Sequence, residues 1–119
     1  MYLISKILIG LVALEHLYFM YFEMFAWETI GKRTFKSIPE NLFKPTKALA
    51  ANQGLYNGFL AAGLIWSILI NNNEWALYVS IFFLSCVIVA GIYGSITASK
   101  KIFFVQAVPA ILALIAVHF

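Results

Sequence analysis

The stretch from Trp75 to Thr97, WALYVSIFFLSCVIVAGIYGSIT, holds no charged residue and no proline. As an α-helix it is long enough to cross the ~30 Å hydrocarbon core of a bilayer. Three further apolar runs cover residues 3–27, 48–70 and 102–119, and even the last would reach ~27 Å as a helix. The runs lack the period-two alternation of sheet strands. The sequence therefore predicts an all-α fold, an integral membrane four-helix bundle that forms a single domain over residues 1–119.

Composition supports a membrane protein and excludes several soluble classes. The chain has 119 residues, of which 63% are hydrophobic and only 11% are charged, whereas soluble domains average about 25% charged residues. The single cysteine, Cys86, excludes an intrachain disulfide and a cysteine-based zinc site. Phosphate-binding loops, GxSxG and HExxH are absent. We expect no metal, no cofactor and no nucleic-acid partner.

The basic residues predict the orientation of the chain in the bilayer. Seven of the eight lie in the first and third connections between the apolar runs, and Lys6 is the eighth. Cytoplasmic loops are enriched in Lys and Arg. The chain is therefore expected in the cell membrane as a multi-pass protein with both termini outside. The first connection also contains Ser37 and Glu40, which favour either a short interfacial helix with Ser37 as its N-cap or a solvated linker.

Ionisable residues in the first run are the strongest functional signal. Glu15, His16 and Glu23 would each be costly inside a bilayer, so each is a functional candidate. His16 and Glu23 are seven residues apart and share one helix face with Trp27, whereas Glu15 points about 100° away. This pattern predicts an acid–base pair of Glu23 and His16, with Glu15 in a separate role.

The second run divides into a polar side and a side of small residues. Asn52, Gln53, Tyr56 and Asn57 fall within an arc of about 140°, and Gly54 and Gly58 lie on the opposite side. Such small residues favour close helix packing. A second small-residue face carries Gly91 and Ser95 in the third run. We expect either face to serve packing or a homo-oligomer.

Depth along the four runs suggests a polar layer. Glu23, Asn52, Tyr93 and Gln106 each lie about four residues, or ~6 Å, from the cytoplasmic end of their run. His16 lies deeper. These positions predict a polar pocket open toward the cytoplasmic leaflet, although interhelical hydrogen bonding alone would also explain single members. Pro109 is expected to kink the fourth run beside Gln106.

Four motifs carry a resemblance to a known family. The first motif begins with Glu15-His16-x-Tyr18-Phe19-Met20, and the second begins with Asn52-Gln53-Gly54-Leu55-Tyr56-Asn57-Gly58. The third is Ala90-Gly91-Ile92-Tyr93-Gly94, and the fourth is Gln106-x-x-Pro109-Ala110. Together they resemble the small four-span membrane proteins of bacteria and fungi, about 120 residues long, that are grouped as a domain of unknown function. The resemblance implies the fold and the membrane location but no established activity.

Three functions remain open at this point. In the first, a lipophilic small molecule binds in the polar pocket, with isomerase-like acid–base chemistry from Glu23 and His16. The residues that would contact this ligand are Trp27, Asn52, Gln53, Tyr56, Asn57, Tyr93 and Gln106. In the second, the protein is a small proton-coupled exporter that uses Glu15, although the strong charge asymmetry argues against the dual topology of such exporters. The third is a structural or assembly protein of the membrane without chemistry.

Overall fold

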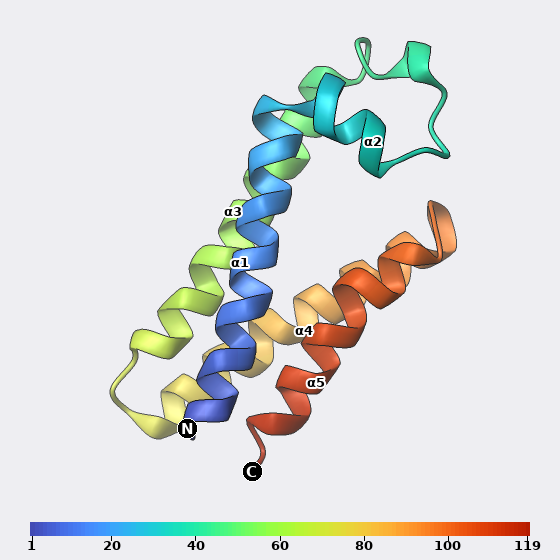
Figure 1. The fold of residues 1–119 in the computed structure, drawn as a ribbon. Helices are drawn as coiled ribbons and strands as arrows, with labels where there is room; N and C mark the ends of the chain where they lie inside the picture. The colour runs from blue at the N-terminus through green and yellow to red at the C-terminus, as the bar shows by residue number, and fades with distance from the viewer. The chain divides into compact units, whose positions relative to one another are not determined.

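The computed structural model describes residues 1–119, and it is all-α without strands, as predicted. Its four main helical segments are α1 (Leu3–Phe25), α3 (Lys47–Leu69), α4 (Asn73–Thr97) and α5 (Val108–Ala116) (Figure 1). The helices α1, α3 and α4 begin and end within two residues of the predicted runs 3–27, 48–70 and 75–97. Three of the four apolar runs thus match the bounds of a helix.

Two of these helices, α1 and α4, are long and apolar enough to cross a membrane. The segment Phe103–Ala116 is a shorter apolar helix, and α3 carries polar residues in its first half. Two such helices alone are weak evidence for a membrane protein, because buried helices of soluble proteins pass the same test. The four-span bundle and its single domain therefore stay predictions.

The fourth run is interrupted where Pro109 was expected to disturb it. A π-helical turn, η3 (Phe103–Ala107), precedes α5, and Pro109 lies at the start of α5. Proline has no N–H to donate and its ring displaces the carbonyl four residues earlier, here that of Val105. The irregular turn beside Gln106 follows from this local constraint.

The connection between α1 and α3 differs from both predicted forms. It contains a π-helical turn η1 (Trp27–Gly31), one helical turn α2 (Lys32–Thr34) and a 3-10 turn η2 (Glu40–Leu42). No helix begins at Ser37. Proline restricts the residue before it to extended backbone, so Pro39 prevents a helix from starting at Ser37, and Pro39 itself is the N-cap of η2.

The chain divides into two compact units, which are described separately. The first comprises Met1–Leu14 and Leu60–Phe119, and the second comprises Glu15–Phe59. In the first unit, α4 and α5 lie side by side (Figure 1). Its core contains Ile9, Val12, Ala13, Leu64, Leu84, Val87, Ala110 and Ala113.

Close backbone approach holds the first unit together. A Cβ at Gly91 would lie 2.7 Å from both the Cβ and the backbone nitrogen of Ala107, so only glycine lets α4 approach η3 this closely. The Ser5 hydroxyl donates a hydrogen bond of 2.9 Å to the Ala116 carbonyl. This bond links the beginning of α1 to the end of α5. The small residues of α4 thus serve packing within the chain.

The second unit has an aromatic core. Phe22, Trp27, Phe43 and Ala50 are its buried members, and Phe19, Phe35 and Ile38 pack against them. The backbone leaves the helical region at Ala26, where φ is −140° and ψ is 31°, and this residue separates α1 from η1. The turn that follows directs Trp27 into the core.

Candidate functional site: a buried carboxyl group between α1 and α3

Glu23 and Asn57 form the polar centre of the second unit. The Asn57 side-chain amide donates a hydrogen bond of 2.5 Å to Glu23 Oε1. Glu23 is only 4% exposed, and Asn57 is half-buried. Buried carboxyl groups are rare unless a partner satisfies them. This contact brings together two of the residues that the sequence singled out.

Gly54 allows this contact to form. A Cβ at Gly54 would lie 3.0 Å from Glu23 Cβ and 2.8 Å from Met24 Cγ. The backbone of α3 therefore rests directly on α1, and the short Asn57 side chain, one turn further along, reaches the carboxyl group. The interpretation of Gly54 and Gly58 as a packing face is confirmed within the chain, because a Cβ at Gly58 would lie 2.7 Å from the Met20 sulfur.

His16 lies on the same face of α1 and is fully buried. Its ring packs edge-on against Phe19, with centroids 5.2 Å apart. Seven helical residues separate His16 from Glu23 by ~10 Å along the helix axis, and Met20 lies between them. A proton cannot pass directly over that distance. Acid–base cooperation of the two residues would need a bridging ligand or water.

Trp27 has a place in the aromatic core. Its indole N–H donates a hydrogen bond of 3.0 Å to Thr46 Oγ1, and its ring centroid lies 5.0 Å from that of Phe43. The ring also covers Gly31, where a Cβ would lie 2.6 Å from the indole. These contacts engage both the face and the N–H of Trp27, and they secure the connection between α1 and α3.

The remaining polar residues of α3 do not join Glu23. Asn52, Gln53 and Tyr56 are exposed, Tyr56 to 58%, and only Asn57 lies at the edge of the glycine face. The helix turns its glycine side toward α1, and this orientation carries the other polar side chains outward. Of these four side chains, Asn57 is the one that forms a hydrogen bond with Glu23.

Tyr93 and Gln106 belong to the first unit. Tyr93 is 68% exposed and borders a shallow apolar depression on α4. The depression is lined by Phe82, Ser85, Cys86, Val89, Ala90 and Tyr93. Gln106 is half-buried in η3. Because these two residues and Glu23 belong to different units, a polar layer contributed by all four runs stays a prediction.

Comparison with known proteins identifies the family of the chain. Residues 10–118 match the family described as "Protein of unknown function (DUF1304)". The chain belongs to the DUF1304 family. It is also 39% identical over 121 residues to the uncharacterized protein YpaA of Lactococcus lactis subsp. lactis (strain IL1403), with all of both chains covered. No solved structure matches the chain. The predicted resemblance to a domain of unknown function is confirmed, and no activity comes with it.

A second carboxyl group in this DUF1304 chain has a different environment. Glu15 is half-buried, and its Oε1 atom is buried without a hydrogen-bond partner. No three His, Cys, Asp or Glu side chains are grouped to hold a metal ion. The ionisable residues of α1 therefore form a paired site at Glu23 and an unpaired carboxyl group at Glu15.

Sequence reasoning missed one contributor to this unit. Thr46 was not singled out, although it accepts the Trp27 hydrogen bond. Met20 stands in the first family motif, and its sulfur packs against Gly58. A methionine one turn from each of two ionisable residues, opposite a GxxxG pair, is the sequence signal for this contact.

Proposed function

We propose that this DUF1304 protein is an integral membrane protein that binds a lipophilic small molecule beside Glu23 and Asn57. The observation that carries the proposal is the buried hydrogen bond between these two side chains. An ionisable group is costly inside a bilayer and is usually retained there for function. Hydrogen bonding between helices needs no carboxyl group, since an amide or hydroxyl would serve equally well.

Membrane insertion explains the outer surface of α1. Leu11, Leu14, Tyr18 and Phe25 are all more than half exposed, and in water so continuous an apolar stripe would drive aggregation. A bilayer covers it without cost. We place the basic connection between α1 and α3 on the cytoplasmic side of the cell membrane, which leaves both termini outside and the Glu23 site near the cytoplasmic leaflet.

The site would contact two parts of the ligand, a polar end at Glu23 and an apolar body beside the methionines. A hydroxyl or amino group of the ligand can form a hydrogen bond with the Glu23 carboxyl group while the Asn57 amide holds that group in place. Met20 and Met24, which pack against the glycine face of α3, adapt readily to apolar shapes because the thioether chain is flexible. In an isomerase-like reaction, Glu23 would remove a proton from one carbon of the ligand and return it to another nearby carbon, which shifts a double bond. His16, ~10 Å further along α1, would take part only through a bridging water or a polar group of the ligand.

The test is the recovery of small molecules with the purified protein. The wild-type protein and three variants are purified in a mild detergent, and organic extracts are compared by mass spectrometry. We expect a lipophilic compound in the wild type that is lost from Glu23→Gln and Asn57→Leu. Tyr56→Phe, an exposed change on the same helix, should retain it. Equal amounts of every extracted compound in the wild type and Glu23→Gln would refute the proposal.

A second candidate function rests on Glu15. A buried carboxyl oxygen without a partner is suited to bind and release a proton, which favours a small proton-coupled exporter. In sealed proteoliposomes, an exporter would show substrate-driven proton flux that disappears in Glu15→Gln and persists in Glu23→Gln. If the flux disappeared only in Glu23→Gln, Glu23 and not Glu15 would be the coupling residue, and this candidate function would be excluded.

A further inference from the structure

The charge of the protein is concentrated in the connection between α1 and α3 and in Lys47, the first residue of α3. We call these residues, 26–47, the cap. It contains five basic and two acidic residues, a formal charge of +3, which equals the net charge of the whole chain. The charges of all other residues therefore cancel. A surface that carries the whole net charge is the natural place to look for an anionic partner.

The cap is a packed structure and presents its charges from fixed positions. Trp27 and Phe43 are buried in its aromatic core, and the Trp27–Thr46 hydrogen bond joins its first and last turns. The Thr34 hydroxyl also donates a hydrogen bond of 2.9 Å to the Ile30 carbonyl. The basic side chains thus project from an ordered base, which lowers the entropy lost when they bind.

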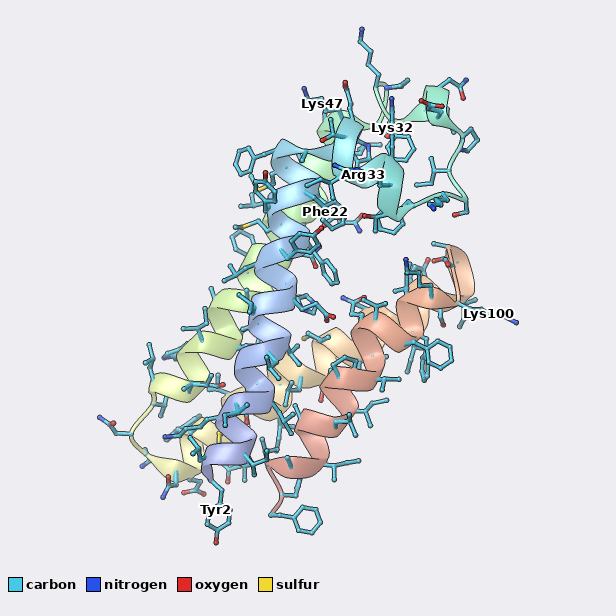
Figure 2. All side chains as sticks on the ribbon, viewed as in Figure 1. Tyr2, Phe22, Lys32, Arg33, Lys47 and Lys100 are labelled. Carbon is cyan, nitrogen blue, oxygen red and sulfur yellow. The ribbon has the colours of Figure 1, made fainter.

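Most of these charges have no intramolecular partner. Lys32 and Glu40 form an ion pair at 3.8 Å. The other four basic residues of the cap are exposed and form no ion pair; they are Arg33, Lys36, Lys44 and Lys47. Figure 2 shows the side chains of Lys32, Arg33 and Lys47 at the same end of the second unit. Four unpaired cations on one short segment attract phosphate groups.

Exposed apolar side chains accompany these cations. Leu42 lies within the cap, and Phe25 and Leu49 flank it; Phe25 and Leu49 are each 72% exposed. Nucleic-acid surfaces offer no apolar phase for such residues, whereas the boundary between head groups and acyl chains accepts both kinds of side chain. We propose that the cap binds the head groups of anionic phospholipids in the surrounding bilayer. The inference rests on the proposed membrane location and is independent of the Glu23 site.

Lipid titration of the full-length protein tests the proposal. The protein in non-ionic detergent is titrated with phosphatidylglycerol or phosphatidylcholine of identical acyl chains, and bound lipids are counted by native mass spectrometry. We expect phosphatidylglycerol to bind about tenfold more tightly, which corresponds to ~1.4 kcal/mol. Replacing all four unpaired cations of the cap by Gln should remove this preference, and 0.5 M salt should weaken it.

A matched pair of double variants locates the effect. Lys44→Gln with Lys47→Gln should lower the preference, whereas Lys100→Gln with Lys101→Gln, which removes the same charge elsewhere, should preserve it. Both pairs change exposed side chains, and thermal unfolding in detergent checks that each variant is folded. Equal affinity of the wild type for the two lipids, or an equal loss in both pairs, would overturn the proposal.

Two further measurements separate the alternatives. In the first, a single-stranded oligonucleotide competes with phosphatidylglycerol for the wild type. If it binds as tightly as the lipid and displaces it, the cap is a general polyanion surface, which contradicts the assignment to lipid. Glu23→Gln should keep the lipid preference unchanged. If the wild type binds its small molecule but shows no preference for phosphatidylglycerol, only the proposal for the cap is refuted.

Discussion

Gly54→Ala measures how closely α3 rests on α1 in the second unit. The added methyl group would lie 2.8 Å from Met24 Cγ and 3.0 Å from Glu23 Cβ, and also 3.1 Å from the backbone oxygen of Met20. The methionine side chain can move aside, but the backbone oxygen cannot move without displacing α1. Overpacking of this kind costs about 1–3 kcal/mol. Against this, replacing a helical glycine by alanine gains ~1 kcal/mol.

Gly10→Ala is the matched control, because it gains the same helix propensity without the steric clash. A Cβ at Gly10 would meet only Ile68 Cδ1, at 4.0 Å, which is an ordinary contact. The difference between the two variants therefore isolates the steric cost at Gly54. We expect Gly10→Ala to be ~2 kcal/mol more stable than Gly54→Ala.

The assay is reversible unfolding in mixed micelles, followed by circular dichroism, with both variants measured beside the wild type. Gly54→Ala should also weaken any retention of a ligand at Glu23, because it separates Asn57 from the carboxyl group. Equal stability of the two alanine variants would refute the close approach of the helices. The Asn57–Glu23 contact, which depends on this close approach, would then be refuted as well.

Two other predictions concern the cap and the orientation of the chain. Thr46→Val removes the acceptor of the Trp27 indole N–H and should lower the unfolding free energy by ~1 kcal/mol. Thr46→Ser keeps the hydroxyl, so its unfolding free energy in the same assay should fall clearly less. In a Cys86→Ser background, Asn72→Cys should react with an impermeant maleimide from outside the cell and Lys36→Cys should not. Labelling of Lys36→Cys alone would reverse the proposed orientation.

The helices could be predicted from the sequence because uninterrupted apolar runs leave few alternatives. The break at η3 was also predictable, since Pro109 acts on its own helix through local geometry. The cap was not predictable, because its form depends on Trp27 reaching Phe43 and Thr46 across the connection. Sequence periodicity carries no information about such contacts.

The site was predicted in part for a related reason. Periodicity places Glu23 and His16 on one face of α1 and divides α3 into two sides, but it does not say which side of α3 meets α1. The structure resolves this in favour of the glycine side, where the backbones approach closely. Asn57 lies at the border of that side and reaches Glu23, whereas Asn52 is carried outward.

Ligand binding at Glu23 can be tested directly with an experimental structure of the protein in lipid nanodiscs. We expect density for a lipophilic molecule in the second unit, with its polar end within hydrogen-bonding distance of a Glu23 carboxyl oxygen. The same density should be missing from Glu23→Gln prepared in parallel. If the wild-type map instead shows Asn57, Met20 and Met24 enclosing the Glu23 carboxyl group completely, with no further density beside it, then Glu23 is a purely structural residue and binds no ligand.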